Sequence, residues 1–381
     1  MGNDYERGHL AYVAQLDSAG RFWLRTKPFS APPNEELMLC LRTFAHAVQL
    51  LQLGTFAQVL DVGCGPGWLS EFLARCGYSV TGVDISPDMV EIARERFAGI
   101  GEIGEGIEAQ AEFHAMPVRD MPWSSRFDAA ILYDTMHHFD NELETLEVIR
   151  RTLVPGGQVF IHEGVRPERG SQGERNLVAE MERYGTLESP FDPEYLEEVV
   201  REAGFDSVRR LREVDDLVDL TTPRRRFRLR GALRDTRFRP EYNVIHAFNP
   251  IPGPLPDELD VFSADIEPQG QWRAEGDELV LVVAVTNSGR AFWPTARFHP
   301  FPRGSVTLGP YLQGPTGERA VELRRTTFPR SLSPGDALAL EVRVPRDQVQ
   351  GQDAIALDLV REGVFWFSEA GSQPVVIPIP A

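Results

Sequence analysis

The chain has 381 residues, of which 42% are hydrophobic, and its formal net charge at pH 7 is −18. This length can bury more than one core, so we expect two domains, and the acidic charge argues against nucleic acid or an anionic membrane as a partner because non-specific binding to either is cationic. The three cysteines show no metal-ligand spacing and no apolar run reaches roughly 18 residues, so we expect no disulfide, no structural metal, no transmembrane segment and a cytoplasmic protein.

Residues 1–56 are predicted to form a helical cap ahead of the first strand. Within them, the segment from Glu35 to Leu53 places apolar residues at helix-like spacing, and Asn34 is positioned to cap this helix. The segment from Arg25 to Phe29 is a candidate lid over a ligand cleft. A surface helix packed on the sheet is an equally good interpretation.

The stretch from Gln58 to Leu69 combines an apolar run, an acid and three glycines at alternate positions, which predicts a strand that turns tightly into a helix. It departs from a dinucleotide-binding fingerprint, because Trp68 stands where the third glycine would be. Asp61 would repel a pyrophosphate and attract a cationic ligand. A second strand, from Ser79 to Asp84, ends in another acid at the spacing of a ribose-binding carboxylate.

The sequence VLDVGCGPGWLSEFLARCGYSVTGVDIS, residues 59–86, resembles the first two motifs of class I S-adenosylmethionine-dependent methyltransferases. The resemblance implies S-adenosylmethionine as the cofactor and a Rossmann-like, seven-stranded α/β methyltransferase sheet over residues 57–249. It implies further that Asp61, Gly63 and Gly65 line the methionine part, that Asp84 holds the ribose hydroxyls and that Ile85 lies against the adenine. The remaining predicted cofactor contacts are Cys64, Met116 and Tyr133.

The third strand and its exit are expected between Glu112 and Pro117, after a loop at residues 99–106. Relatives of this kind usually place an acid there that binds the adenine amino group, and this chain departs from that pattern. Glu112 or Asp120 could substitute. The alternative is that backbone groups and apolar contacts from Ile85 and Met116 hold the adenine.

The fourth strand is predicted from Arg126 to Asp134, and a His-His-Phe-Asp run follows it. Ligands bind at this edge of an open α/β sheet, and histidine can take a proton from a hydroxyl near neutral pH. Either His137 or His138 is therefore the candidate general base. The alternative for each is a hydrogen bond to backbone, or a place beside the cofactor without chemistry.

The fifth strand is expected from Gln158 to Glu163, after a stop signal at Pro155–Gly157. Glu163 could orient the base, bind substrate hydroxyls or cap the next segment. Residues 164–191 read as an irregular substrate-binding stretch.

The sixth and seventh strands are expected at Phe205–Leu211 and Tyr242–Phe248, the last one antiparallel. Between them, residues 224–239 hold eight arginines, which could bind a phosphate-bearing substrate or pair with acids of the chain.

A proline-rich linker at residues 250–260 precedes a region of short alternating strands and turn signals, residues 261–381, for which we predict an all-β immunoglobulin-like sandwich. This region resembles β-sandwich modules attached to bacterial cell-surface glycan enzymes and transporters. Trp293, Trp366 and Phe367 could stack on sugar rings or form the core of the sandwich.

The sequence thus predicts a methyltransferase that O-methylates a sugar or glycan-precursor hydroxyl. The alternatives are methylation of a non-carbohydrate metabolite and a non-catalytic carbohydrate-binding or scaffold protein. No spacing demands a metal ion, although acids after the fourth and fifth strands could supply oxygen ligands. The oligomeric state is not predicted.

Overall fold

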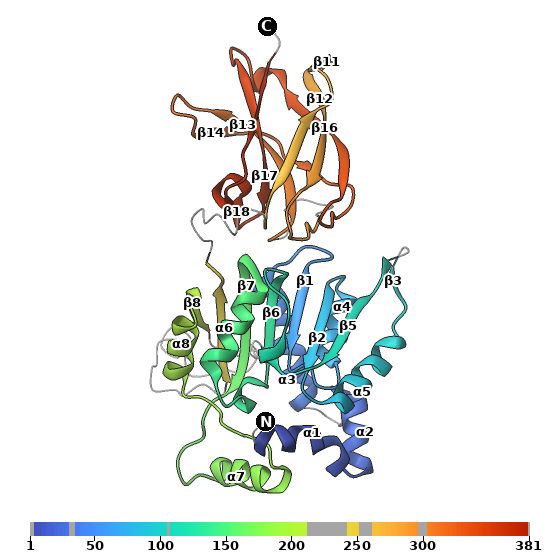
Figure 1. Ribbon diagram of the computed structural model, residues 1–381, viewed down its shortest axis with the longest axis vertical. Coiled ribbons are helices and arrows are strands. Elements are labelled where there is room, and N and C mark those ends of the chain that lie inside the picture. The colour runs from blue at the N-terminus through green and yellow to red at the C-terminus, as the bar shows by residue number, and fades with distance from the viewer. Residues whose placement is uncertain are drawn as a thin grey trace, which may run out of the picture.

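The computed structural model describes residues 4–29, 35–104, 107–211, 242–250, 261–295 and 303–379, which form an α/β part and a C-terminal β part (Figure 1). The α/β part is built on a seven-stranded sheet in the order β5-β2-β1-β6-β7-β9-β8. Its strands are β1 (Gln58–Val62), β2 (Ser79–Asp84), β5 (Gln110–Ala115), β6 (Phe127–Tyr133), β7 (Leu153–Gly164), β8 (Asp206–Leu211) and β9 (Tyr242–Phe248). β9 runs antiparallel to both neighbours, and the other pairs are parallel. The predicted Rossmann-like sheet is therefore confirmed.

Alternate residues of the central strands face opposite layers of helices, because successive side chains of a strand point to opposite faces. Leu60 and Leu132 belong to the core that includes α6 and α8, whereas Val59 and Ile131 belong to the core that includes α3 and α4. Burial on both faces explains why these strands are continuous apolar runs in the sequence. The helices of the two layers are α3 (Glu35–Leu51), α4 (Trp68–Arg75), α5 (Pro87–Ala98), α6 (Glu142–Thr152) and α8 (Pro193–Glu202).

Three further helices lie beyond the carboxyl ends of the strands, at the end of the molecule remote from the β part (Figure 1). They are α1 (Asp4–Gln15), α2 (Ser18–Thr26) and α7 (Gln172–Tyr184). The side chains of Asp17 and Ser171 cap the first turns of α2 and α7 by accepting hydrogen bonds from backbone N–H groups. The short 3-10 helices η1 (Val118–Asp120) and η2 (Met136–His138) follow β5 and β6 at the same edge.

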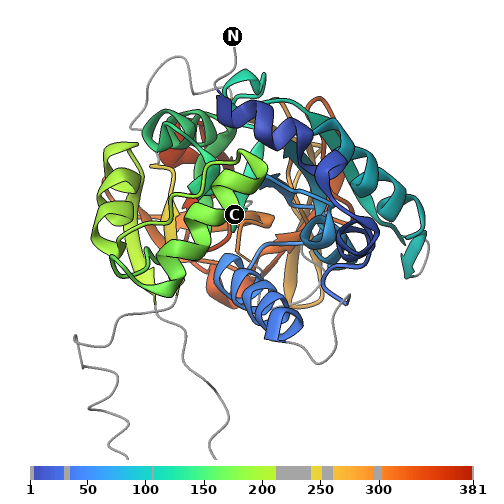
Figure 2. The ribbon, with the colours of Figure 1, turned by 90° about the horizontal axis from the view of Figure 1, so that it is seen from below.

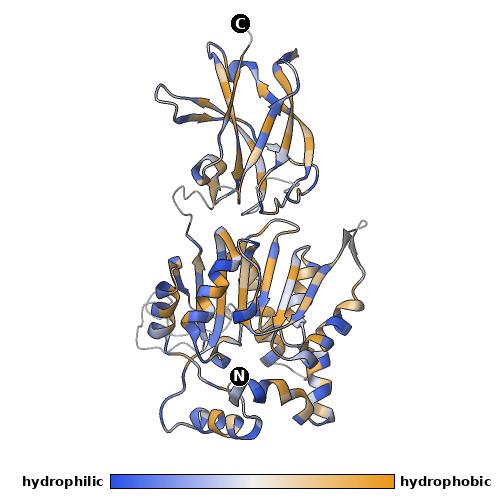
Figure 3. Ribbon diagram, viewed as in Figure 1, coloured by the Kyte–Doolittle hydropathy of each residue, from blue (hydrophilic) through white to orange (hydrophobic). Residues whose placement is uncertain are grey.

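The C-terminal part consists of two antiparallel sheets that share one hydrophobic core. Figure 3 shows hydrophobic residues running through the strands of both parts. One sheet contains β10 (Ala264–Pro268), β11 (Arg273–Glu275), β12 (Glu278–Asn287) and β16 (Ala337–Pro345). The other contains β13 (Val306–Gln313), β14 (Arg319–Glu322), β15 (Thr326–Thr327), β17 (Ala354–Arg361), β18 (Phe365–Trp366) and β19 (Val375–Pro378).

The three aromatic residues considered for sugar stacking are interior. Trp293 is 1% exposed, Trp366 7% and Phe367 0%, so none presents an open ring face to solvent. Trp293 and Phe367 pack edge to face, and the Trp366 ring is covered by the guanidinium groups of Arg319 and Arg325. The sugar-stacking interpretation of these residues is therefore wrong, because Trp293 and Phe367 belong to the core between the two sheets and Trp366 packs in a separate cluster with Tyr311.

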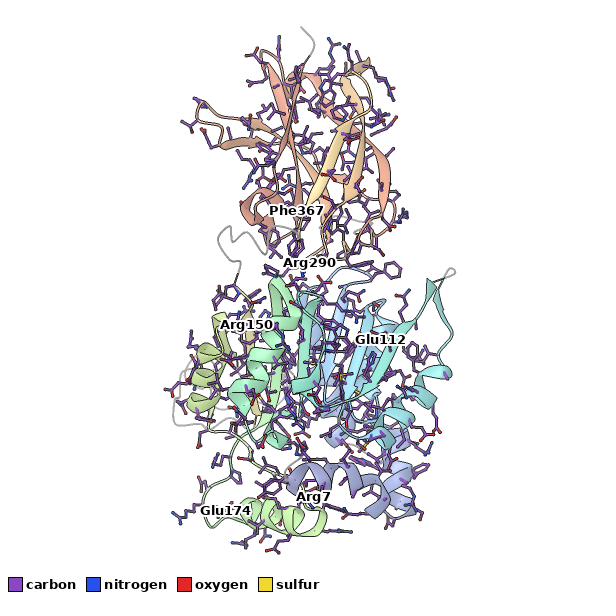
Figure 4. All side chains as sticks on the ribbon, viewed as in Figure 1. Arg7, Glu112, Arg150, Glu174, Arg290 and Phe367 are labelled. Carbon is purple, nitrogen blue, oxygen red and sulfur yellow. The ribbon has the colours of Figure 1, made fainter. Side chains whose placement is uncertain are left out.

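The two parts meet at the amino ends of the parallel strands. There the Arg361 guanidinium of β17 forms an ion pair with Asp128 of β6, and both side chains are almost fully buried. The second Asp128 oxygen accepts the backbone N–H of Gln58 at 2.8 Å. Arg290, labelled in Figure 4, lies at this junction. The β part thus sits at the edge of the sheet opposite to the one where ligands bind in such folds.

Three segments differ from expectation. The sequence predicts that residues 155–157 form a stop before the fifth strand, but they belong to that strand, β7. Gly156 and Gly157 exchange backbone hydrogen bonds with Asn249, which extends the strand through them. The predicted loop at 99–106 contains the short strand β3 (Glu102–Gly104), which pairs with β4 (Ile107–Glu108) directly after that loop. The irregular stretch 164–191 contains the helix α7, on which Leu177, Met181 and Tyr184 recur at helical spacing and are half-buried.

Several predictions lie outside the described residues: the Asn34 cap, the arginine-rich segment 224–239 and most of the linker. The predicted domain boundaries and the immunoglobulin-like topology stay predictions. In the part of the chain that the structure describes, no helix is both long and apolar enough to cross a membrane.

Candidate functional site

A cavity of about 740 Å³ lies at the carboxyl ends of β1, β2, β6 and β7. Its floor is formed by the glycine turn after β1 and by the residues that follow β2 and β6. Residues of α1, α2 and α7 line its other side. The cavity is therefore enclosed between the sheet edge and the helices beyond it (Figure 1).

The glycine turn needs glycine for two reasons. Gly63, Gly65 and Gly67 have φ angles of +66°, +50° and +76°, which L side chains rarely adopt. A Cβ atom on Gly63 would also lie 1.9 Å from Thr135 Oγ1, in the loop after β6. Backbone can therefore approach a ligand closely at this turn, and the residue after β6 is held against it.

The acid that ends β2 fixes the turn from the other side. The two oxygens of Asp84 accept the backbone N–H groups of Gly65 and Ser86, both at 2.9 Å. Burial raises the pKa of this carboxyl. Because Asp84 also lines the cavity, its remaining lone pairs can accept hydrogen bonds from hydroxyl groups of a ligand.

Seven of the eight predicted cofactor contacts line the cavity, and Asp61 does not. Its carboxylate is 2% exposed and accepts the Ser70 hydroxyl of α4 at 2.6 Å. Burial raises the pKa of Asp61 to about 7. The expected direct contact of Asp61 with the methionine part is therefore not what the structure shows, since the side chain turns toward α4 behind the glycine turn.

The seven residues that do line the cavity are Gly63, Cys64, Gly65, Asp84, Ile85, Met116 and Tyr133. Neither substitute for the missing adenine-binding acid is among the lining residues. Glu112 instead binds Arg126 and Thr81, and Asp120, in η1, is not among the residues that line the cavity. The alternative for adenine is therefore the one already named, backbone groups and apolar contacts from Ile85 and Met116.

The two histidines after β6 occupy different environments. His137 Nδ1 lies 2.7 Å from Glu163 Oε2, and its Nε2 lies 3.3 Å from Glu188 Oε2. Although burial opposes it, the charge of Glu163 and these hydrogen bonds raise the pKa of His137 well above its usual value. His137 is accordingly an imidazolium at neutral pH, with both nitrogens engaged, and it cannot accept a proton.

His138 has the opposite character. Its Nδ1 donates to the Leu187 carbonyl oxygen at 2.7 Å, which assigns the proton to Nδ1 and leaves the lone pair on Nε2. Burial and the neighbouring His137 charge lower the pKa of His138. A neutral imidazole with a free Nε2 lone pair is the arrangement that a general base requires.

Glu163 is completely buried and contacts no ligand space. Its Oε1 accepts the backbone N–H groups of Thr135 and Met136, while its Oε2 holds His137. Of the three roles considered for Glu163, the structure fits orientation of the loop and its histidine. Glu188, from the loop after α7, completes this arrangement and was not predicted by the sequence.

Two groups of side chains in this loop could hold a metal ion by proximity: His137 with His138 and Glu188, and His137 with Asp134 and Glu163. The two His137 nitrogens, His138 Nδ1 and the Glu163 carboxylate already have hydrogen-bond partners in the protein. These contacts account for the arrangement without an ion.

Sequence reasoning missed the residues that α1 and α7 bring to the cavity, among them Glu6, His9, Tyr12, Asn176 and Glu180. No local signal marks them, because their place depends on how the two helices fold over the sheet edge.

Residues 59–157 match the family model described as "Methyltransferase domain". The chain is 34% identical over 109 residues to a ubiquinone biosynthesis O-methyltransferase of Xanthomonas oryzae pv. oryzae, which covers 28% of this chain and 42% of that protein. It is 29% identical over 147 residues to a sterol 4-C-methyltransferase of Caenorhabditis elegans, covering 39% of this chain and 42% of that protein. The chain thus spans less than half the length of these curated relatives.

Among solved structures, the Haemonchus contortus phosphoethanolamine N-methyltransferase 2 in complex with S-adenosyl-L-methionine matches with a TM-score of 0.47 and 19% identity, covering 66% of this chain and 60% of that one. The prediction of a methyltransferase domain is confirmed for residues 59–157.

Proposed function

We propose that this protein is an S-adenosylmethionine-dependent O-methyltransferase of a small-molecule hydroxyl, with His138 as the general base. The observation that carries the proposal is that the two adjacent histidines have different hydrogen-bond partners. His137 is fixed between Glu163 and Glu188, whereas His138 presents a free Nε2 lone pair beside the cavity.

The residues present fit the cofactor. Gly63, Gly65 and Gly67 leave backbone of the turn uncovered by side chains, and Asp84, at the end of β2, places its carboxylate beside this turn. Ile85 and Met116 offer apolar surface for a purine. When bound, S-adenosylmethionine would supply an electrophilic methyl group, and S-adenosylhomocysteine would be the leaving group as the sulfur–carbon bond breaks.

The residues of the chain then have two tasks. The cavity walls hold the acceptor hydroxyl and the methyl group close enough to react, which replaces a collision by a fixed geometry. His138 Nε2 takes the hydroxyl proton as the oxygen–carbon bond forms, and the Leu187 carbonyl stabilises the resulting imidazolium through Nδ1–H. His137 keeps the Glu163 and Glu188 carboxylates in place and so holds the loop.

The class of the acceptor is part of the proposal. By their names, the two relatives act on a ubiquinone precursor and on a sterol, and only the first is an O-methyltransferase. A sugar or glycan precursor stays a proposed acceptor, because polar residues such as Asn176 and Thr186 line the cavity. The aromatic rings of the β part are buried and so do not add support for a sugar as the acceptor.

Calorimetric titration of S-adenosylmethionine and S-adenosylhomocysteine into the wild type tests the cofactor site. Transfer of a labelled methyl group is then measured on phenols, sterols, sugars and nucleotide sugars with the wild type and His138→Gln. We expect cofactor binding in both proteins and turnover that falls by about 100- to 10,000-fold in the variant.

Two results would contradict the proposal. Absence of cofactor binding by the wild type removes the methyltransferase function altogether and favours a binding or scaffold role. Full turnover by His138→Gln removes the proposed base.

A further inference from the structure

Helices α1 and α7 contact one another, and both line the cavity (Figure 2). At Gly8 of α1 the contact is close, because an added Cβ atom would lie 2.1 Å from the carbonyl oxygen of Gly185, the residue that caps the end of α7. The rings of Tyr12 and Tyr184 pack edge to face at 5.0 Å on the same seam. Any side chain on Gly8 would therefore hold the two helices apart.

This contact brings His9 into the site. The His9 ring lies 4.6 Å from the His138 ring, between centroids, at an interplanar angle of 65°. His9 lines the cavity, yet its Nε2 atom is buried and has no hydrogen-bond partner. A buried polar atom without a partner costs about 1–3 kcal/mol, so this atom needs a partner that the protein does not supply.

The charges around His9 limit what that partner can be. Burial, His138 and His137 lower the pKa of His9 to about 4, against the carboxylates of Glu188 and Glu6, which raise it. The imidazole is therefore neutral at pH 7 and offers an anion no opposite charge.

The other ionised groups on this side of the cavity also disfavour an anion. Glu180 and Glu188 line it as carboxylates, and the Arg119 guanidinium is engaged by Glu6 of α1. The other cations that line the cavity are also engaged by acids, Lys27 by Glu36 at 3.5 Å and His137 by Glu163 and Glu188. A phosphate or carboxylate on the acceptor would therefore compete with carboxylates of the protein for each of these cations.

We propose that His9 is a binding residue for the methyl acceptor and hydrogen-bonds an uncharged polar group next to the reacting hydroxyl. The contact between α1 and α7 holds His9 in the position this role requires. The acceptor is accordingly a molecule without phosphate or carboxylate near that hydroxyl. This inference rests on the proposed function for the nature of the acceptor, but the closed position of His9 is independent of it.

The first test measures that position without an acceptor. The full chain, labelled with ¹⁵N-histidine and saturated with S-adenosylhomocysteine, is titrated by NMR, and the His9 signal is assigned by its loss in His9→Gln. We expect His9 to titrate near pH 4 in the wild type and near its ordinary value of about 6.5 in Gly8→Ala. Alanine has a higher intrinsic helix propensity than glycine, so the substitution does not itself disfavour the helical backbone of α1.

Gly101→Ala is the matched control, because a Cβ atom there meets nothing within 4 Å, and it should leave His9 unchanged. A wild-type His9 that titrates near 6.5, or a Gly8→Ala protein that still titrates near 4, overturns the inference. Because cofactor binding is verified in the same samples, either result is distinct from failure of the methyltransferase proposal.

The second test uses the acceptor found by the methyl-transfer screen. His9→Ala should raise KM for the acceptor about tenfold, the equivalent of one hydrogen bond, with little change in kcat and in the Kd of S-adenosylhomocysteine. An analogue of the acceptor that carries a carboxylate beside the hydroxyl should react more slowly. An unchanged KM, or a preference for the anionic analogue, overturns the role of His9.

Discussion

The ion pair between Arg361 and Asp128 gives a prediction whose size can be worked out from the structure. Arg361 is 1% exposed and Asp128 2% exposed, so neither charge is solvated by water. If Arg361 is replaced by methionine, the Asp128 carboxylate keeps only the Gln58 N–H as a partner. Removing one member of a buried pair typically destabilises a protein by about 3–5 kcal/mol, because the other charge is left uncompensated.

The structure places the expected value for Arg361→Met at the lower end of that range, about 3 kcal/mol. The Nε and Nη1 atoms of Arg361 have no hydrogen-bond partner, so methionine also removes two buried donors that destabilise the wild type. Asp128→Asn should lose more, because it leaves the Arg361 cation buried. The double variant should be more stable than Asp128→Asn alone, since no buried charge is then unpaired.

The assay is urea unfolding at pH 7 followed by tryptophan fluorescence, with calorimetric titration of S-adenosylhomocysteine on each variant. Arg273→Met is the control, because the Arg273 ion pairs with Glu275 and Glu341 are exposed, and its unfolding curve should match the wild type. Cofactor affinity should stay within about twofold in every variant, because the pair lies at the amino ends of the strands. A loss below about 1 kcal/mol for Arg361→Met would refute the reasoning.

Two further predictions concern the site. Gly63→Ala should lose S-adenosylhomocysteine binding in calorimetry, because its Cβ would lie 1.9 Å from Thr135 Oγ1; Gly170→Ala, which has a similar positive φ but open space, should bind normally. Glu163→Gln should lower the pKa of His137, measured by histidine NMR. Because the folded pKa of His137 is raised, its pairing stabilises the protein fully below the unfolded value of about 6.5 and is lost as pH rises through the folded pKa. The wild type should therefore lose thermal stability between neutral and alkaline pH more steeply than Glu163→Gln, and equal slopes would count against the assignment.

Local sequence patterns determined the sheet and the cofactor edge. Apolar runs ending in an acid placed β1 and β2 within a residue or two, and the glycine turn between Asp61 and Trp68 predicted the tight approach that the structure shows. These features depend on neighbours in the chain, namely side-chain period and backbone conformation, so one sequence suffices to find them. The same patterns found His137, His138 and Glu163, because each closes a strand at the same edge.

What the sequence could not decide are the roles that depend on contacts between distant segments. His137 and His138 are adjacent and chemically alike. Glu163 from β7 and Glu188 from the loop after α7 hold His137 on both sides, whereas His138 contacts the Leu187 carbonyl oxygen. The sequence also could not predict the direction of the Asp61 side chain, because this direction depends on the hydrogen bond from Ser70 in α4.

The sequence by itself therefore determined which residues come to the edge of the sheet, because strand period and turn conformation are local properties. Only the tertiary structure decided their protonation states, the part that α1 and α7 play over the cavity, and the fate of Trp293 and Trp366 in a core. Burial and electrostatic interaction act through space, and the groups that shift a pKa or cover a ring here lie far away in the chain.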